Sequence, residues 1–167
     1  MATSIFVNLP VRDLDASKAF FAGLGYSFNE QFTDEKAACM VIDDRMFAML
    51  LVEPFFATFV DKPVADARAS TEVLVALSFY SAHEVRAKAE TALSFGARRH
   101  KEPQDLGRMF QWGFEDLDGH IWELLWADPA HSRADCAHAR TACRTALSAP
   151  VPLWHSTYRA GPRRTTA

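Results

Sequence analysis

Apolar residues recur along residues 1–53 in an order that predicts a strand, a helix and three further strands. The first strand covers Ser4–Val11. Asp13 has the short polar side chain of a helix N-cap, and apolar residues follow it at helical spacing as far as Gly25. Alternating and continuous apolar runs then predict the three further strands, Ser27–Phe32, Lys36–Ile42 and Met46–Val52.

The same order of elements is predicted again over residues 71–130. A strand at Thr71–Tyr80 precedes a helix at Ala82–Phe95, and apolar runs then predict three strands, Ala97–His100, Arg108–Phe114 and Ile121–Trp126. The helix end Leu24-Gly25 corresponds to Phe95-Gly96, 71 residues later, and the turn Asp43-Asp44 corresponds to Asp118-Gly119, 75 residues later. Such a nearly constant offset indicates an internal duplication.

The hairpin Phe114–Trp126 is the most informative stretch of the chain. Asp118-Gly119 is a turn signal between two apolar strands, because both residue types tolerate positive φ. Residues Ile121, Glu123 and Leu125 share one face of the second strand, while Trp122, Leu124 and Trp126 share the other. The tryptophan face requires a packed layer. Glu123 is left as a lone carboxylate on an apolar face, which makes it a candidate functional group.

Two segments fall outside the repeated pattern. The linker 54–70 contains Phe55, Phe56 and Phe59, which predict a helix that packs on the core or on a dimer partner, with a ligand contact as the alternative. Residues 131–167 are rich in Ala, Arg, Thr and Pro and poor in large apolar side chains, so we expect a loosely ordered tail.

Composition bounds the class of protein. With 167 residues and 49% apolar residues, the chain is expected to form one domain, residues 1–130, followed by the tail. No run reaches the 18 apolar residues of a membrane span, no signal peptide is evident, and three irregularly spaced cysteines predict no disulfide framework. We therefore expect a cytoplasmic protein that does not bind membranes.

Charge is distributed unevenly. Residues 1–130 hold 12 Lys and Arg against 20 Asp and Glu, a net charge of −8, whereas residues 131–167 carry +5. The acidic body argues against nucleic-acid binding, which depends on cationic contacts to phosphate.

Two motifs together resemble the vicinal oxygen chelate superfamily, which includes glyoxalases, bleomycin-resistance proteins and extradiol dioxygenases. One is D-G-H-I-W-E, residues 118–123, and the other is the strand–corner–helix segment Ile5–Gly25, which ends in L-G. The resemblance covers residues 1 to about 130, with modules at about 1–53 and 71–130. It implies an α+β fold in which two paired βαβββ modules form a curled mixed sheet around a cleft, and it implies a homodimer.

The resemblance also implies where a metal would bind. Metal-dependent members are similar in placing one ligand on the first and one on the last strand of each module. These positions correspond here to Phe6, Ala48, Leu74 and Glu123, and only Glu123 can bind a metal ion. Because a catalytic divalent site usually needs at least three protein ligands, no cofactor is expected; a divalent metal held by Glu123 and water is the alternative.

The remaining candidates are residues that could touch a ligand in the cleft. Besides Phe6, Ala48 and Leu74, the expected ligand-binding residues are Asn8, Tyr80, Arg108 and Trp112. Glu123 itself has three interpretations: a general base, a group that recognises a cationic or hydrogen-bonding ligand, or a structural carboxylate satisfied by Asn8. His120 follows the turn and is expected to be solvated rather than catalytic.

These observations predict a protein that binds a small organic molecule in an aromatic cleft without the usual metal centre. One alternative is a metal-dependent lyase or dioxygenase-like enzyme that uses Glu123. Another is a degenerate paralogue that acts through protein contacts. The fold by itself does not choose among them.

Overall fold

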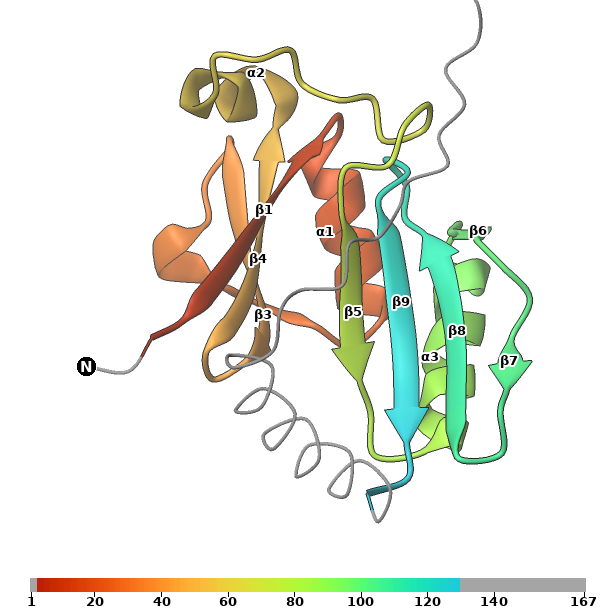
Figure 1. Ribbon diagram of the computed structural model, residues 1–167. Coiled ribbons are helices and arrows are strands. Elements are labelled where there is room, and N and C mark those ends of the chain that lie inside the picture. The colour runs from red at the N-terminus through yellow and green to blue at the C-terminus, as the bar shows by residue number, and fades with distance from the viewer. Residues whose placement is uncertain (1–2, 130–167) are drawn as a thin grey trace, which may run out of the picture. The chain divides into compact units, whose positions relative to one another are not determined.

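The first module forms a four-stranded sheet in the computed structural model, which describes residues 3–129. The strand order is β1-β4-β3-β2, with β1 parallel to β4 and the other pairs antiparallel (Figure 1). The strands are β1 (Ile5–Val11), β2 (Ser27–Asn29), β3 (Ala37–Asp43) and β4 (Met46–Val52).

The second module repeats this topology. Its sheet has the order β5-β9-β8-β6, β5 runs parallel to β9, and a short additional strand, β7, pairs with β8. The strands are β5 (Leu74–Ser78), β6 (Arg98–Arg99), β7 (Gln104–Asp105), β8 (Met109–Glu115) and β9 (Ile121–Ala127). The predicted α+β fold with two modules of the same order is therefore confirmed. β7 lies where the sequence predicted a loop.

Both long helices begin and end where the sequence indicates. In α1 (Leu14–Gly23) the Asp13 side chain accepts the Ala16 N–H at 2.9 Å, and in α3 (Ala82–Ser94) Ser81 caps the first turn. Glycines follow both helices with φ of +89° and +102°, a conformation that suits glycine.

One short helical segment was not predicted, and the predicted helix of the linker is divided into two short segments. The 3-10 helix η1 (Glu30–Phe32) replaces the second half of the predicted strand Ser27–Phe32, because the Asn29 side chain accepts the Gln31 N–H at 3.0 Å. In the predicted linker, α2 (Glu53–Phe56) leads into η2 (Ala57–Phe59), where the rings of Phe55 and Phe59 pack edge to face at 5.0 Å. The predicted tail lies outside the described residues.

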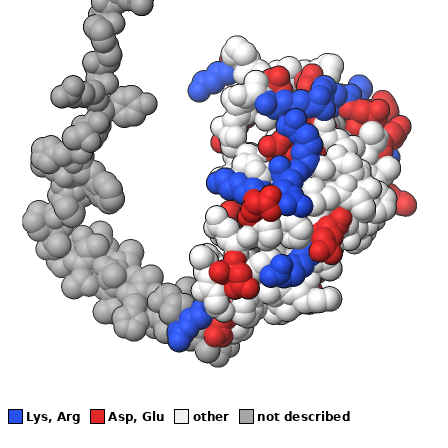
Figure 2. Space-filling model, turned by 90° about the vertical axis from the view of Figure 1, so that its right-hand side faces the viewer, with Lys and Arg blue, Asp and Glu red and all other residues white. Residues whose placement is uncertain are grey.

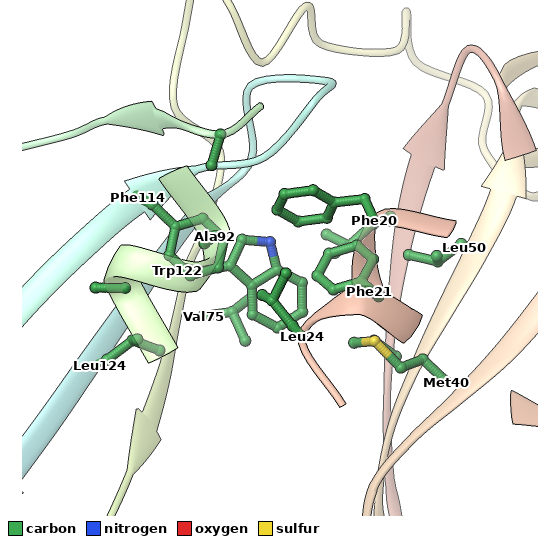
Figure 3. Close-up of a cluster of buried hydrophobic side chains, with 14 of the residues drawn as sticks. Phe20, Phe21, Leu24, Met40, Leu50, Val75, Ala92, Phe114, Trp122 and Leu124 are labelled. Atoms are coloured by element: carbon green, nitrogen blue, oxygen red, sulfur yellow. The ribbon is translucent and has the colours of Figure 1, made fainter. Parts of the chain in front are cut away.

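Aromatic side chains of α1 join the two modules into one hydrophobic core. Phe21 packs edge to face on Trp122 of β9 at 5.1 Å, and Phe20 packs on Phe114 of β8 at 6.0 Å (Figure 3). All four side chains are at most 2% exposed. One face of each sheet is thereby buried, while the opposite face of each sheet is turned away from this core.

The loop between β8 and β9 is organised by the buried carboxylate of Asp116. Its Oδ1 accepts the backbone N–H groups of Asp118, Gly119 and His120, each at 3.0 Å, and its Oδ2 accepts the indole N–H of Trp122 at 2.9 Å. Burial raises the pKa of Asp116, and its hydrogen bonds and the neighbouring His120 oppose that shift. The loop therefore spans five residues rather than the two-residue turn that the sequence indicated.

The same loop contacts the first module. Asp118 Oδ1 accepts a hydrogen bond from Arg12 Nε at 3.0 Å, and Asp118 Oδ2 accepts one from the Ser17 hydroxyl at 3.2 Å. His120 Nε2 donates to the Pro10 carbonyl at 2.7 Å, and this side chain is only 8% exposed. The prediction that His120 is solvated is therefore wrong, because the turn directs its ring toward β1.

The described surface carries charges of both signs. Figure 2 shows Lys and Arg interspersed with Asp and Glu on one face. Exposed ion pairs include Arg86–Asp105 and Arg99–Glu102. Within residues 3–129, no helix has the length and apolar character needed to cross a membrane.

We predict that Gly119→Ala lowers the free energy of unfolding by about 2–4 kcal/mol. Gly119 has φ of +99°, and an added Cβ would lie 2.9 Å from the backbone nitrogen of Arg68. Gly107, with φ of +77° and nothing within 4 Å of the added atom, is the matched control. Gly107→Ala should cost only about 1 kcal/mol, because it adds backbone strain without a collision. Urea denaturation measures both; equal losses would contradict the close packing of the loop on the linker.

Candidate functional site

Glu123 lies in the middle of β9 on the face that points away from the core. Its cross-strand neighbours are Ala76 in β5 and Gly113 in β8. Because neither neighbour has a long side chain, the space beside the Glu123 carboxylate is open toward both adjacent strands. Among the described residues, none donates a hydrogen bond to Glu123 and none forms an ion pair with it. This part of the chain therefore supplies no structural partner for Glu123, including the predicted one, Asn8.

The absence of a side chain at Gly113 keeps this row open. A Cβ at this position would lie 3.0 Å from the Trp122 carbonyl oxygen and 3.8 Å from both the Glu123 Cα and the His100 ring. Gly113 thus separates Glu123 from a second polar residue, His100, without filling the space between them.

His100 is a site residue that the sequence did not place on a strand face. Its backbone N–H reaches the Gly113 carbonyl at 3.5 Å and continues the register in which Arg98 pairs with Glu115. The ring Nδ1 lies 3.7 Å from Glu115 Oε1, and Arg98 Nε donates to the other oxygen of Glu115 at 3.1 Å. Glu123, His100 and Glu115 therefore share one face of the second sheet. This arrangement follows from the antiparallel register of the strands, which the sequence alone does not give.

The corresponding face of the first module is apolar and aromatic. The rings of Phe6 in β1 and Phe47 in β4 stack at 4.8 Å with an interplanar angle of 15°. Asn8 lies two residues beyond Phe6 on the same face and pairs with Met49. Phe6 is 51% exposed, so the stacked pair is accessible.

The structure corrects the placement of Ala48. It pairs with Val7 and Met40, is fully buried, and points toward the core rather than to the face of Phe6. The reason is the hairpin length: two residues separate Asp43 from Met46, whereas five separate Glu115 from Ile121. The sequence matched Ala48 to Glu123 by a constant offset of 75 residues. Because the two hairpins differ in length by an odd number of residues, this offset matches residues on opposite faces of their sheets; a shift of one residue along a strand moves a side chain to the other face.

Trp112 is also a core residue and does not lie on the face of Glu123. It stands opposite Leu124, is 8% exposed, and has the Arg99 guanidinium 5.6 Å from its ring centroid. Alternation along β8 decides this, because Phe110, Trp112 and Phe114 all point toward the helices. On the outward face of the first module, the aromatic side chains are those of Phe6 and Phe47.

The other predicted ligand-binding residues are dispersed. Leu74 is 53% exposed at the start of β5, Tyr80 is 95% exposed beyond its end, and Arg108 is exposed before β8. Asn8 lines a separate hollow of about 210 Å³ that includes Phe56, Glu72 and His120 but not Glu123. The structure therefore does not bring all the predicted ligand-binding residues together at one site.

No group of three or more His, Cys, Asp or Glu residues that could hold a metal ion occurs within residues 3–129. The row of Glu123, His100 and Glu115 is not such a group, and Arg98 already donates a hydrogen bond to Glu115. The arrangement can bind a ligand through one free carboxylate and an imidazole.

Comparisons with known proteins agree with this architecture. A family model described as bleomycin resistance protein-like N-terminal matches residues 3–43, which include β1, α1 and β2 and all of β3. Among solved structures, a hypothetical protein, SA1046 from S. aureus, is 24% identical with a TM-score of 0.65, and the match covers 76% of this chain and 95% of that chain. The chain has the vicinal oxygen chelate fold.

Two further structures of the vicinal oxygen chelate fold are similar at lower identity. A glyoxalase/bleomycin resistance protein/dioxygenase family enzyme from Burkholderia phytofirmans PsJN is 16% identical, with a TM-score of 0.63 and coverage of 75% of this chain and 99% of that chain. A bleomycin resistance determinant encoded on the transposon Tn5 is 20% identical, with a TM-score of 0.54 and coverage of 75% and 98%. A comparison with curated proteins gives no match.

We predict that Ala48→Asp lowers the free energy of unfolding by about 3 kcal/mol or more, because it places a carboxylate in the core without a partner. Asn8→Asp adds the same charge to the adjacent strand but on the exposed face, so it should cost less than about 1 kcal/mol. Thermal and urea denaturation compare the two. A stable Ala48→Asp protein would contradict the face assignment.

Proposed function

We propose that the protein binds a small organic molecule against the two sheet faces that point away from the core. The observation that carries the proposal is the free carboxylate of Glu123, held on a sheet face between Ala76 and Gly113 with no partner among the described residues. A partly buried carboxylate that is not used structurally is a natural anchor for a cationic or hydrogen-bonding ligand group.

The first module supplies the apolar part of this proposed site. The stacked rings of Phe6 and Phe47 provide a flat surface for an apolar or aromatic portion of the ligand, and the Asn8 amide can orient a polar substituent. A flat surface and a charged anchor suit an amphiphilic ligand. The bleomycin resistance protein-like match of residues 3–43 supports binding, rather than catalysis, as the starting hypothesis.

The proposed site works without the usual divalent metal centre. On the first module, the outward-facing residues near the expected positions are Phe6, Asn8, Phe47 and Met49, and on β5 they are Leu74, Ala76 and Ser78. None of these side chains is a carboxylate, imidazole or thiolate, which are the ligands that divalent catalytic sites require. Glu123 would then contact the ligand directly.

The proposal includes a homodimer. Within residues 3–129, β1 pairs only with β4 and β5 only with β9, so the first strand of each sheet has an edge that no described strand covers. Exposed apolar side chains lie on these edge strands: Ile5 is 56% exposed, Phe6 is 51% exposed and Leu74 is 53% exposed. A second copy could cover these edges and bring more surface to the ligand.

A metal-dependent enzyme is the second candidate function, and one observation favours it. His100 and Glu115 lie on the same face as Glu123, and an imidazole oriented by a carboxylate can transfer protons. In that case Glu123 would hold a divalent metal together with water and act in lyase or dioxygenase-like chemistry.

Metal content separates the two functions. We predict that the full-length protein, purified without chelator, contains well under one equivalent of Ni, Zn, Mn or Fe by plasma mass spectrometry. Added divalent metal should raise the melting temperature equally in the native protein and in Glu123→Gln. Near-stoichiometric metal that disappears in Glu123→Gln would refute the metal-free site and establish the second candidate.

Ligand binding is tested by a thermal-shift screen of amphiphilic cations and aromatic amides. We predict that any ligand that stabilises the native protein binds Glu123→Gln at least about tenfold more weakly, since a charge-assisted contact contributes about 1.5–3 kcal/mol. Glu90→Gln, a change at an exposed position of α3, is the control and should bind normally. Failure of all ligands, together with a protein that co-purifies in stoichiometric amount, would favour action through protein contacts.

A further inference from the structure

A cavity of about 540 Å³ lies beside β5, an edge strand in the part of the chain that the structure describes, and next to the β3–β4 hairpin of the first module. Its volume falls within the range of small-molecule sites. Its wall contains two tyrosines, two carboxylates and four further large apolar side chains: Tyr26, Tyr80, Asp43, Glu84, Ile42, Met46, Leu77 and Phe79. Among the described residues, no Lys, Arg or His lines it.

Both carboxylates are fixed in position while one oxygen of each stays available. Asp43 Oδ1 accepts the Asp44 N–H at 2.8 Å, and Glu84 Oε2 accepts the Tyr80 N–H at 3.1 Å. The second oxygen of each carboxylate accepts no hydrogen bond from residues 3–129. The cavity therefore presents two oriented negative charges.

The tyrosine rings add surfaces that attract cations. Tyr26 is held edge to face by Phe21 at 6.3 Å, and burial raises the pKa of Tyr26 to about 12, so its hydroxyl stays neutral. The Lys88 ammonium already lies 5.0 Å from the centroid of this ring but donates to the Leu24 carbonyl at 2.5 Å and does not line the cavity. Tyr80 is 95% exposed, so its ring is accessible to a ligand.

We propose that this cavity binds a small organic cation, such as a quaternary ammonium group, between the carboxylates of Asp43 and Glu84 and the rings of Tyr26 and Tyr80. Aromatic faces and carboxylates both favour a cation whose charge is spread over methyl groups, because such a cation loses little hydration energy on binding. A small anion would meet two carboxylates in the cavity wall, and the nearby Lys88, which interacts with Glu84, lies outside that wall.

This site differs from the proposed site at Glu123 and does not rest on it. Ala76 lines the cavity and also stands opposite Glu123, so the two sites meet at β5, but Glu123 is not part of the cavity wall. Either site can exist without the other.

The test is a calorimetric and NMR titration of the full-length protein with choline and with its uncharged carbon isostere, in which carbon replaces the ammonium nitrogen. We expect saturable binding of choline and at least about tenfold weaker binding of the isostere. Asp43→Asn and Glu84→Gln should each weaken choline binding about five- to tenfold. Both amides can still accept the backbone hydrogen bond, so only the charge is removed.

Matched variants control for non-specific charge effects. Asp44→Asn, at the same turn, and Glu90→Gln, on the same helix, change charge outside the cavity wall and should leave choline binding unchanged. Asp43 and Glu84 lie outside the proposed Glu123 site, so a loss of choline binding in these two variants assigns the binding to this cavity. No saturable binding, equal binding of the isostere, or equal losses in the control variants would overturn the proposal.

Discussion

The buried carboxylate of Asp116 is the interaction on which the rest of the structure depends. It gathers three backbone N–H groups of its own loop and the indole N–H of Trp122, so it sets the path of the chain into β9. Two residues further on, Asp118 binds Arg12 and thereby ties this loop to the first module. A carboxylate buried to this degree is stable only because it is fully hydrogen-bonded.

The register of β9 follows from that loop and separates core from site. Trp122 enters the core against Phe21 of α1, and alternation then turns Glu123 to the opposite face. The large side chains of β9 thus hold the modules together, while the small neighbours Ala76 and Gly113 keep the carboxylate accessible. One face of β9 therefore packs in the core and stabilises the fold, and its other face carries the candidate site residue Glu123.

The two modules differ in chemistry although they share a topology. The outward face of the first sheet offers stacked aromatic rings, whereas that of the second offers Glu123, His100 and Glu115. The cavity beside β5 again combines tyrosines with carboxylates. With a net charge of −8 over residues 1–130, the described surface is better suited to organic cations than to anions.

The sequence by itself determined the order of elements, the helix cap at Asp13, and the two faces of β9 with Glu123 opposite the tryptophans. These features are local, because capping and alternation depend on a few adjacent residues. The tertiary structure alone decided that Ala48 and Trp112 lie in the core, that His120 is buried against Pro10, and that His100 shares the face of Glu123. Those outcomes depend on loop length and on the pairing of strands that are distant in sequence. A change of one residue in a loop or in the strand register moves every following side chain of that strand to the opposite face of the sheet.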